Sequence, residues 1–396
     1  MRTVQDVVIV SGVRTAIGGF GGSLKDVPPS QLGAMVIREA VKRAGIEPKD
    51  VQHVVMGQVI PTAPKDAYVA RVCGVDAGIP VETPALTLNR LCGSGSQAIV
   101  SAAQMVQLGE ADIVVAGGTE SMSRSPYVTT THRWGTRMGD TTMIDALTTT
   151  LSDPWAGEHM GLTAERVAER YGITREEQDA LALRSQKNAA AAIAEGRFAE
   201  QILPVEMKTR KGVTVFDTDE HVRGNTTLEA LAGMPTAFKK GGSVTAGNAS
   251  GINDAAAAVV MMTAAEAERR KLRPMARIVS WGHAGVPPEI MGVGPVYAVP
   301  IALKRAGLTV ADLDVIESNE AFAAQAAYVS RELGFPVEKV NPNGGAIAMG
   351  HPIGATGAIL TVKALYELER IKGRYGLITM CIGGGQGLAT IIERLG

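Results

Sequence analysis

Two stretches of the chain, 262 residues apart, repeat the same order of residue types. Residues 40–56 read AVKRAGIEPKDVQHVVM, and residues 302–318 read ALKRAGLTVADLDVIES. Each stretch contains the end of an amphipathic helix, an Ala-Gly stop, a short connection and an apolar strand. Two copies at so long a period do not indicate a solenoid, which has many short repeats. They predict a duplicated domain, with chance similarity of two αβ units as the alternative.

The repeat continues beyond these stretches. The sequence CGSG at 92–95 precedes a predicted helix over 97–108 and a strand over 113–116; GATG at 354–357 precedes a predicted helix over 359–371 and a strand over 375–380. After a glycine-rich turn the second copy continues into a final strand, 388–393. The matching strand of the first copy is 255–262, far downstream, so residues 122–252 are interpreted as an insertion between neighbouring strands.

The predicted fold class is therefore α/β, with two similar halves packed together and an inserted loop domain. Alternation of strands and helices in each half predicts a mixed, largely parallel sheet covered by helices. The expected boundaries are 1–121 with 253–274 for the first half, 122–252 for the insertion and 275–396 for the second half.

Composition excludes several functional classes. The 396 residues are 45% hydrophobic and 20% charged, with a formal net charge of −1, which gives no support to nucleic acid or an anionic membrane as partner. No apolar run approaches the roughly 18 residues of a membrane span. The first residues show neither an apolar signal core nor an Arg/Ser-rich presequence, so a cytoplasmic enzyme is expected. Three widely spaced cysteines argue against a disulfide framework and a CxxC zinc site, and no metal is expected.

Cys92 is the first candidate for chemistry. It follows an apolar strand-like segment, 85–88, and precedes a predicted helix, whose free N–H groups and dipole are expected to lower the pKa of a thiol. Its flanking glycines allow a substrate to approach closely. A small buried cysteine that fills a strand–helix junction is the alternative, and the local sequence favours neither.

His351 occupies nearly the same place in the second copy as Cys92 does in the first. Four glycines lie within residues 344–354 around it. If the halves pack about a pseudo-twofold axis, Cys92 and His351 converge, as an activated Cys–His nucleophile requires. A surface or capping histidine is the alternative.

Other candidates lie at predicted strand ends. Cys381 precedes three glycines and is either an acid/base group beside an oxyanion hole or a buried structural cysteine. Asn319, in the sequence NEAF, follows the strand 315–316, where α/β sheets place ligands, although a solvated helix cap is the alternative. Cys73 has no such context and is interpreted as structural. The glycine-rich stretches match neither the P-loop nor a dinucleotide fingerprint, so no nucleotide cofactor is expected.

These motifs together resemble the thiolase family, from one end of the chain to the other. The matching segments, in the family's order, are NRLCGSG at 89–95, GGTESM at 117–122, HMG at 159–161, GNASG at 247–251, NEAF at 319–322, NGGAIAMGHP at 343–352 and CIGGG at 381–385.

The resemblance implies a role for each catalytic candidate. Cys92 is the acyl-accepting nucleophile, and His351 takes its proton and helps to bind the thioester oxygen. Asn319 holds a water that completes this first oxyanion hole. Cys381 is the base at the α-carbon of acetyl-CoA. The backbone N–H groups of Cys92 and Gly383 form a second oxyanion hole.

The resemblance also implies a binding site for coenzyme A thioesters, which are substrates rather than cofactors. Arg223 would meet the adenine end, while His159, Ser250 and Phe238 would line the pantetheine. Met160 and Met291 would border the acyl pocket. A homotetramer built from dimers is implied by short-chain members, which join dimers through an insertion loop near 122–150.

The implied activity is reversible Claisen condensation of two acetyl-CoA molecules, with propionyl-CoA as a further expected substrate. Ile359 stands where Arg is common in acetoacetyl-CoA thiolases, which puts strict four-carbon specificity in doubt. A degradative 3-ketoacyl-CoA thiolase and a non-catalytic thiolase-like scaffold are the alternatives. A decarboxylating ketoacyl synthase is disfavoured because it lacks a second catalytic cysteine.

Overall fold

The computed structural model describes residues 5–209 and 212–396. Its first half contains β1 (Val7–Thr15), α1 (Pro29–Arg43), β3 (His53–Gly57), α2 (Val69–Asp76), β4 (Ala85–Leu88), α3 (Ser94–Leu108), β5 (Ile113–Ser121) and, after the insertion, β11 (Asn253–Thr263). Its second half contains β12 (Ala276–Gly285), α9 (Gly294–Ala306), β13 (Val315–Ser318), α10 (Ala323–Leu333), α12 (Thr356–Ile371), β14 (Tyr375–Ile382) and β15 (Gln386–Arg394). Short elements α8 (Ala264–Arg269) and α11 (Ala346–Met349) lie between these.

The two halves have the same strand order. The first runs β4-β3-β5-β11-β1, and the second runs β13-β14-β15-β12, with a parallel bridge from Ile316 to Val340 in the place of an outer strand. Hydrogen bonds between β1 and β12, at Val8↔Arg277 and Ile9↔Ala276, join both into one sheet path. This agreement in order supports duplication over chance similarity.

The sheet is mixed, as predicted, but the expectation that it is largely parallel is wrong. Only β3–β4, β3–β5, β13–β14 and the short β1–β8 pair are parallel among the described pairs. The long pairs β1–β11, β5–β11, β14–β15 and β12–β15 are antiparallel. The glycine turn after β14 makes a hairpin, and hairpins join antiparallel strands. In the first half the insertion replaces this turn, so β5 and β11 keep the antiparallel pairing.

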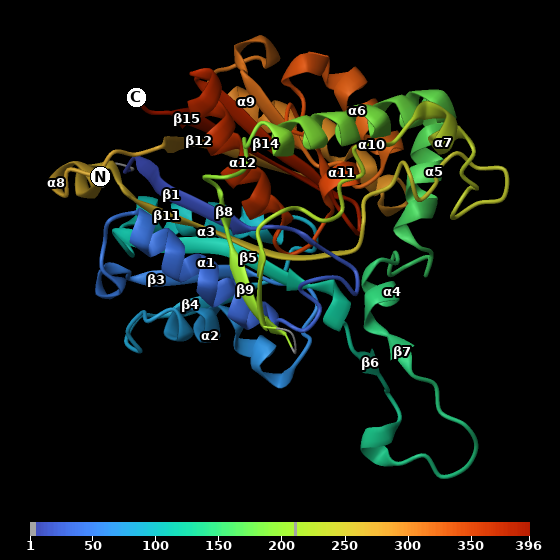
Figure 1. Ribbon diagram of the computed structural model, residues 1–396, viewed down its shortest axis with the longest axis horizontal. Coiled ribbons are helices and arrows are strands. Elements are labelled where there is room, and N and C mark those ends of the chain that lie inside the picture. Colours follow the sequence, from blue (N-terminus) through green and yellow to red (C-terminus); the bar gives the residue numbers. More distant parts are fainter. Residues whose placement is uncertain (1–4, 210–211) are drawn as a thin grey trace.

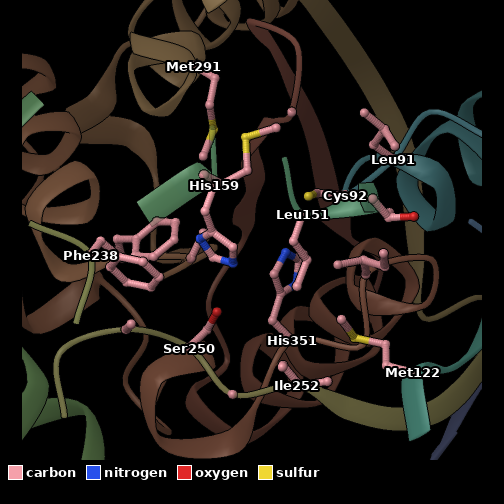
Figure 2. A pocket seen from close by; sticks show the side chains of 18 residues that line it. Leu91, Cys92, Met122, Leu151, His159, Phe238, Ser250, Ile252, Met291 and His351 are labelled. Carbon is pink, nitrogen blue, oxygen red and sulfur yellow. The ribbon is translucent and has the colours of Figure 1, made fainter. Parts of the chain in front are cut away.

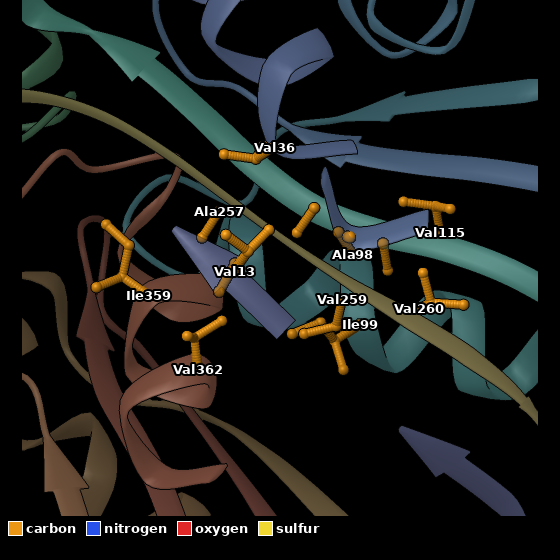
Figure 3. Packing of buried hydrophobic residues seen from close by; sticks show 14 of the residues in the cluster. Val13, Val36, Ala98, Ile99, Val115, Ala257, Val259, Val260, Ile359 and Val362 are labelled. Atoms are coloured by element: carbon orange, nitrogen blue, oxygen red, sulfur yellow. The ribbon is translucent and has the colours of Figure 1, made fainter. Parts of the chain in front are cut away.

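Helices α3 and α12 pack against each other between the halves (Figure 1). On the first sheet, the Thr119 hydroxyl donates to Pro29 of α1, while its neighbour Gly118 lies against Gly354 beside α12. Successive side chains of a strand point to opposite faces, so α1 and α12 cover opposite sides. Figure 3 shows Val13 of β1, Val259 of β11, and Ile359 and Val362 of α12 in this packed core.

The insertion forms helices, short hairpins and loops on one side of the molecule (Figure 1). Its elements are β6 (Tyr127–Val128), β7 (Ile144–Asp145), α4 (Ala146–Thr150), α5 (Met160–Tyr171), α6 (Arg175–Ala194), β8 (Ile202–Leu203), β9 (Val205–Thr209), β10 (Gly212–Phe216) and α7 (Leu228–Ala232). A buried ion pair between Arg14 of β1 and Asp219, with nitrogen and oxygen 2.7 Å apart, fastens it to the first half. The segment between β6 and β7 projects away from the body (Figure 1).

In the described part of the chain, no helix is long and apolar enough to cross a membrane.

Candidate active site

The close approach of α3 and α12 brings the candidate residues together. A Cβ on Gly95 would lie 2.7 Å from the backbone nitrogen of Ala358, and one on Gly357 would lie 2.3 Å from that of Ser96. Both helices begin three residues earlier than predicted, at Ser94 and Thr356. The reason is that these two glycines belong to the helices, where they permit helix contact, rather than to the preceding turns.

Cys92 lies in a strained turn directly before α3. Leu91 has a φ of 47°, an uncommon conformation for a residue with a branched side chain. Two side chains hold this turn: Asn89 Oδ1 accepts from Leu91 N at 2.8 Å, and Ser94 Oγ accepts from Arg90 N at 2.8 Å. The Ser94 hydroxyl in turn donates to Leu91 O at 2.7 Å. The turn therefore presents the Cys92 thiol to the cavity in a fixed position.

Cys92 is a neutral thiol at rest, contrary to the expectation of a lowered pKa. Burial raises the pKa of Cys92 to about 11 and outweighs hydrogen bonds from the Gly383 and Cys92 backbone N–H groups, which lower it. The buried carboxylate of Glu120 raises it further. A thiol in this state needs a base to become a nucleophile. The two N–H groups both reach the sulfur, and their part in a second oxyanion hole stays a prediction.

His351 lies beside the same cavity and is 5% exposed. Its Nδ1 is 2.7 Å from Thr356 Oγ1, and its Nε2 is 3.4 Å from Asn319 Nδ2. Burial lowers the pKa of His351 to about 4, so the imidazole is neutral at pH 7. A neutral imidazole has a free ring nitrogen that can accept a proton.

Asn319 is buried, and its Oδ1 makes no hydrogen bond within the described residues. An unpartnered buried oxygen is costly unless a water or ligand meets it. The next residue, Glu320, accepts hydrogen bonds from Asn341 Nδ2 at 2.7 Å and Ser185 Oγ at 2.6 Å. Glu320 thereby links residues 319–322 to the segment 341–351, which ends at His351, and to α6 of the insertion.

Cys381 lies inside β14, paired with Gly387 of β15, and is fully buried. It packs in one apolar cluster with Met160 and Met291. Burial raises the pKa of Cys381 above its usual range, and a thiolate at Cys92 raises it further. Cys73 is also buried, with its thiol directed at Ser30 O at 3.3 Å, as a structural cysteine would be.

A cavity of about 260 Å³ opens onto Cys92 and His351 (Figure 2). Figure 2 shows His159 and His351 on either side of it, with Phe238 beside His159. The rings of His159 and Phe238 stack with centroids 4.7 Å apart, and His159 Nδ1 accepts from Gly161 N at 3.0 Å. Burial lowers the pKa of His159, which favours its neutral form.

The structure brings most of the predicted site residues to this cavity. Its walls include Cys92, His159, Met160, Phe238, Ser250, Met291, His351 and Gly383. Asn319 and Cys381 are not part of its wall: Asn319 contacts His351, and Cys381 packs in one cluster with Met160 and Met291. Arg223 lies exposed on the insertion outside it.

Several cavity residues were not predicted. They include Leu91, Met122, Leu151, Ile252 and Ile353. Leu91 and Met122 lie in quoted motifs, Ile252 and Ile353 directly follow one, and Leu151 lies at the end of the insertion loop. An apolar residue in a loop gives no sequence signal that distinguishes a cavity wall from the hydrophobic core. Among the described residues, no cluster of three or more His, Cys, Asp or Glu side chains forms a metal site.

The fold and the site define an acyl-transfer class of protein: a duplicated α/β scaffold that brings a turn-held thiol and an imidazole to one cavity, with a second thiol packed against the methionines of its wall. A family model for the thiolase N-terminal domain matches residues 7–265, and one for the thiolase C-terminal domain matches residues 272–394. The chain belongs to the thiolase family.

Close relatives cover almost the whole chain. Beta-ketothiolase BktB of Cupriavidus necator is 60% identical over 392 residues, which are 99% of this chain and 100% of the relative. An acetyl-CoA acetyltransferase of Syntrophomonas wolfei is 52% identical over 398 residues, 99% of this chain and 100% of that protein.

Solved structures of two kinds of thiolase have the same fold. The Bacillus anthracis acetyl-CoA acetyltransferase superposes with a TM-score of 0.98 at 47% identity, covering 100% of both chains. Human mitochondrial 3-ketoacyl-CoA thiolase superposes with a TM-score of 0.97 at 44% identity, also over 100% of both chains. The fold alone therefore does not distinguish a synthetic from a degradative member.

Proposed function

We propose that this protein catalyses the reversible condensation of two acetyl-CoA molecules to acetoacetyl-CoA and free coenzyme A. The observation that carries the proposal is that Cys92 and His351 line one cavity and that Cys381 packs in the apolar cluster of two further cavity residues, Met160 and Met291. The names of the relatives, beta-ketothiolase and acetyl-CoA acetyltransferase, support the same reaction. Coenzyme A thioesters are substrates in this proposal, and no resident cofactor is required.

In the first half-reaction, Cys92 Sγ attacks the thioester carbonyl of acetyl-CoA while His351 accepts the thiol proton. The C–S bond to coenzyme A breaks, and the leaving thiolate takes the proton from His351. The N–H groups of Cys92 and Gly383, which both reach the sulfur, support a role in holding the acyl oxygen. The product is an acetyl-Cys92 thioester and free coenzyme A.

In the second half-reaction, Cys381 removes a proton from the methyl group of a second acetyl-CoA. A thioester α-proton is weakly acidic, so the enolate oxygen needs preorganised donors. A water on Asn319 is proposed for this purpose, with His351 as a second donor when its Nε2 carries a proton, and the unpartnered Asn319 Oδ1 is consistent with a bound water. The enolate carbon then attacks acetyl-Cys92, and the C–S bond of the acyl-enzyme breaks. The released Cys92 thiolate takes up the proton that the Cys381 thiolate removed from the methyl group, which regenerates the enzyme. Ping-pong kinetics are expected.

The cavity also supports the proposed substrate contacts. His159, Phe238 and Ser250 line its entrance side and are proposed to contact the pantetheine, with Met160 and Met291 beside the acyl group. Arg223 is exposed, as a contact for the adenine end would be. The proposed unit boundaries stay 1–121 with 253–274, 122–252 and 275–396, and cytoplasmic location stays a prediction.

We propose further that the chain forms a homotetramer, a dimer of dimers, through the β6–β7 projection. Its apolar side chains include Trp134, 88% exposed, and Met138, 89% exposed. Exposed large apolar groups at a projecting tip are typical of an interaction site. Light scattering at micromolar concentration tests this: Trp134→Ser with Met138→Ser should reduce the mass, and a monomeric parent protein would contradict it.

The assay for the main proposal follows the absorbance of the Mg²⁺–acetoacetyl-CoA complex after coenzyme A is added. Loss of the absorbance with formation of acetyl-CoA is expected. A folded protein that leaves acetoacetyl-CoA intact but binds coenzyme A would instead favour the non-catalytic scaffold. A degradative 3-ketoacyl-CoA thiolase would also give a signal, but would act best on longer chains.

A further inference from the structure

The hydroxyl of Thr356 lies against Nδ1 of His351, whose side chain lines the cavity. Thr356 is the first residue of α12 and is 3% exposed. Its Oγ1 is 2.7 Å from His351 Nδ1 and donates to Pro352 O at 3.0 Å. The other ring nitrogen, Nε2, is directed toward Asn319.

Counting protons assigns the direction of these hydrogen bonds. A carbonyl oxygen can only accept, and a hydroxyl carries one proton, so the bond to Pro352 O uses that proton. The contact with Nδ1 then requires that the ring nitrogen be the donor. Nε2 is left with a lone pair, opposite the Asn319 amide group at 3.4 Å, which can donate to it.

The first half of the molecule contains the same pair of hydrogen bonds, and there the direction of both bonds is unambiguous. Ser94 begins α3 as Thr356 begins α12, 262 residues apart, as in the sequence repeat. The Ser94 hydroxyl donates to Leu91 O and accepts from Arg90 N, a backbone N–H that can only donate. In each half, the helix-start hydroxyl therefore donates to the carbonyl of the preceding turn and has a lone pair for an N–H group.

We infer that Thr356 is a positioning residue that keeps the His351 proton on Nδ1 and so leaves Nε2 as the base for Cys92. The inference rests on the proposed function for the role of His351. When Nε2 takes the thiol proton, the ring becomes an imidazolium, and the Nδ1–H bond to Thr356 becomes charge-assisted and stronger. Thr356 thus stabilises the pair of Cys92 thiolate and His351 imidazolium more than the neutral pair of thiol and imidazole.

The test measures alkylation of Cys92 by iodoacetamide, which needs no coenzyme A substrate. Thr356→Val removes the acceptor and keeps the shape of the side chain, and Thr356→Ser restores the hydroxyl. The matched control is Thr361→Val, a buried threonine of the same helix whose hydroxyl donates to Gly357 O at 2.9 Å. Rates are measured from pH 6 to pH 10, with peptide mapping to assign the label.

Loss of a hydrogen bond to a charged group corresponds to about 10- to 100-fold in rate. Thr356→Val should therefore slow alkylation at pH 7 by about that factor and move its pH profile to higher pH. Thr356→Ser and Thr361→Val should stay within about threefold of the parent. For condensation, kcat should fall in Thr356→Val with KM for acetyl-CoA nearly unchanged. Burial raises the pKa of Glu120 to about 8, so this carboxyl near Cys92 titrates within the pH range of the test, and it does so in all variants alike.

An unchanged or faster alkylation of Cys92 in Thr356→Val would overturn the inference, because a threonine that donates to Nδ1 would hold the opposite tautomer. Equal slowing in Thr361→Val would assign the effect to helix packing and overturn it as well. Failure of the proposed function has a different signature: the parent protein would alkylate at Cys92 with the predicted dependence on Thr356 but would not cleave acetoacetyl-CoA.

Discussion

The two halves share their scaffold but carry different chemistry at corresponding points. Ser94 and Thr356 begin the two central helices at the repeat spacing, and each hydroxyl closes the turn before its helix. The first turn presents a thiol, Cys92, and the second presents an imidazole, His351. Duplication therefore supplies two equivalent positions at one centre, and different residues at those positions supply the nucleophile and the base of the proposed reaction.

The residues at the ends of β3 and β13, which occupy corresponding places in the two halves, also differ in their chemistry. Gly57 ends β3, and Asn319, at the repeat spacing, follows β13. A Cβ on Gly57 would lie 2.7 Å from the carbonyl carbon of Ser94, so the first half has no room for a side chain there. The second half has room for an amide that reaches the histidine. The comparison teaches that one half fixes the nucleophile by backbone packing, while the other provides side chains for proton transfer and oxyanion binding.

The sharpest test of this division is Cys92→Ser, for which we expect the largest effect. An alcohol in the same buried turn is a much weaker nucleophile, and loss of a covalent nucleophile typically costs at least about 10⁴-fold in kcat. Thiolysis of acetoacetyl-CoA by the variant checks this. Cys73→Ser is the control, since Cys73 is buried away from the cavity, and its rate should remain close to that of the parent.

Stoichiometric iodoacetamide labelling with peptide mapping gives a second measurement of the same assignment. Cys92 should carry most of the label because Cys73 and Cys381 are fully buried. Label found mainly on Cys381 would reverse the roles of the two thiols.

Cys381→Ala should separate the two half-reactions, with the next largest effect. Only the second half-reaction needs a base at the α-carbon, and a general base contributes typically about 10²–10⁴-fold. Trapping with radiolabelled acetyl-CoA should give near-normal acetyl-Cys92, while condensation falls by that factor. A folded variant that cannot be acetylated would show that Cys381 also serves the first step and would contradict the division of labour.

Gly57→Ala tests whether backbone packing holds the nucleophile. The new methyl would collide with the backbone of Ser94, including its carbonyl oxygen at 2.9 Å, and overpacking of this kind costs about 1–3 kcal/mol. We expect a lower urea midpoint with an unchanged m value, and slower alkylation of Cys92.

The matched control for that variant is Gly233→Ala. Gly233 ends α7 with an ordinary helical conformation, and a Cβ there has its nearest neighbour at 3.4 Å. Equal destabilisation of the two variants would show that the effect comes from loss of glycine in general and not from the contact with Ser94.

Much of this architecture is predictable from the sequence because duplication places the same pattern of helices and strands in the chain twice. The strand 85–88 and the order of elements around Cys92 and His351 agree with the structure. The predicted starts of α3 and α12 are three residues late because glycines before a helix are typical of a turn. Gly95 and Gly357 instead belong to the helices and allow them to contact each other. Antiparallel pairing was missed because strand direction depends on connections that span the insertion.

The electrostatics of the site was harder to predict. A helix start does supply N–H groups to Cys92, but local sequence does not show how much apolar surface covers a thiol, and burial reverses the net shift of its pKa. The contact between Thr356 and His351 was likewise invisible, since a threonine four residues after His-Pro is also an ordinary first residue of a helix. The roles of Asn319, Cys381 and the coenzyme A contacts stay predictions until they are measured.

The smallest expected effect is the dependence of kcat/KM on acyl chain length. It compares the two sides of the cavity wall, one from the insertion and one from the second half. The proposed acyl end of the cavity is bordered by Met160 of the insertion and by Met291 and Gly383 of the second half, and a Cβ on Gly383 would lie 3.1 Å from Met160 Cε. Methionine is flexible and unbranched, so it can adjust to one extra methylene.

A methylene that fits contributes about 0.8 kcal/mol by burial, whereas one that does not fit costs about 1–3 kcal/mol. We therefore expect kcat/KM for 3-ketovaleryl-CoA to lie within about tenfold of that for acetoacetyl-CoA, with a steep fall by 3-keto-octanoyl-CoA. A five-carbon substrate worse by more than about a hundredfold would indicate a strict four-carbon pocket and rigid methionines. If the eight-carbon substrate is best, the short-chain assignment is wrong and the degradative alternative takes its place. Met160→Ala should then show which side of the pocket sets the limit, because it enlarges only the wall that the insertion contributes and leaves the wall of the second half as it is.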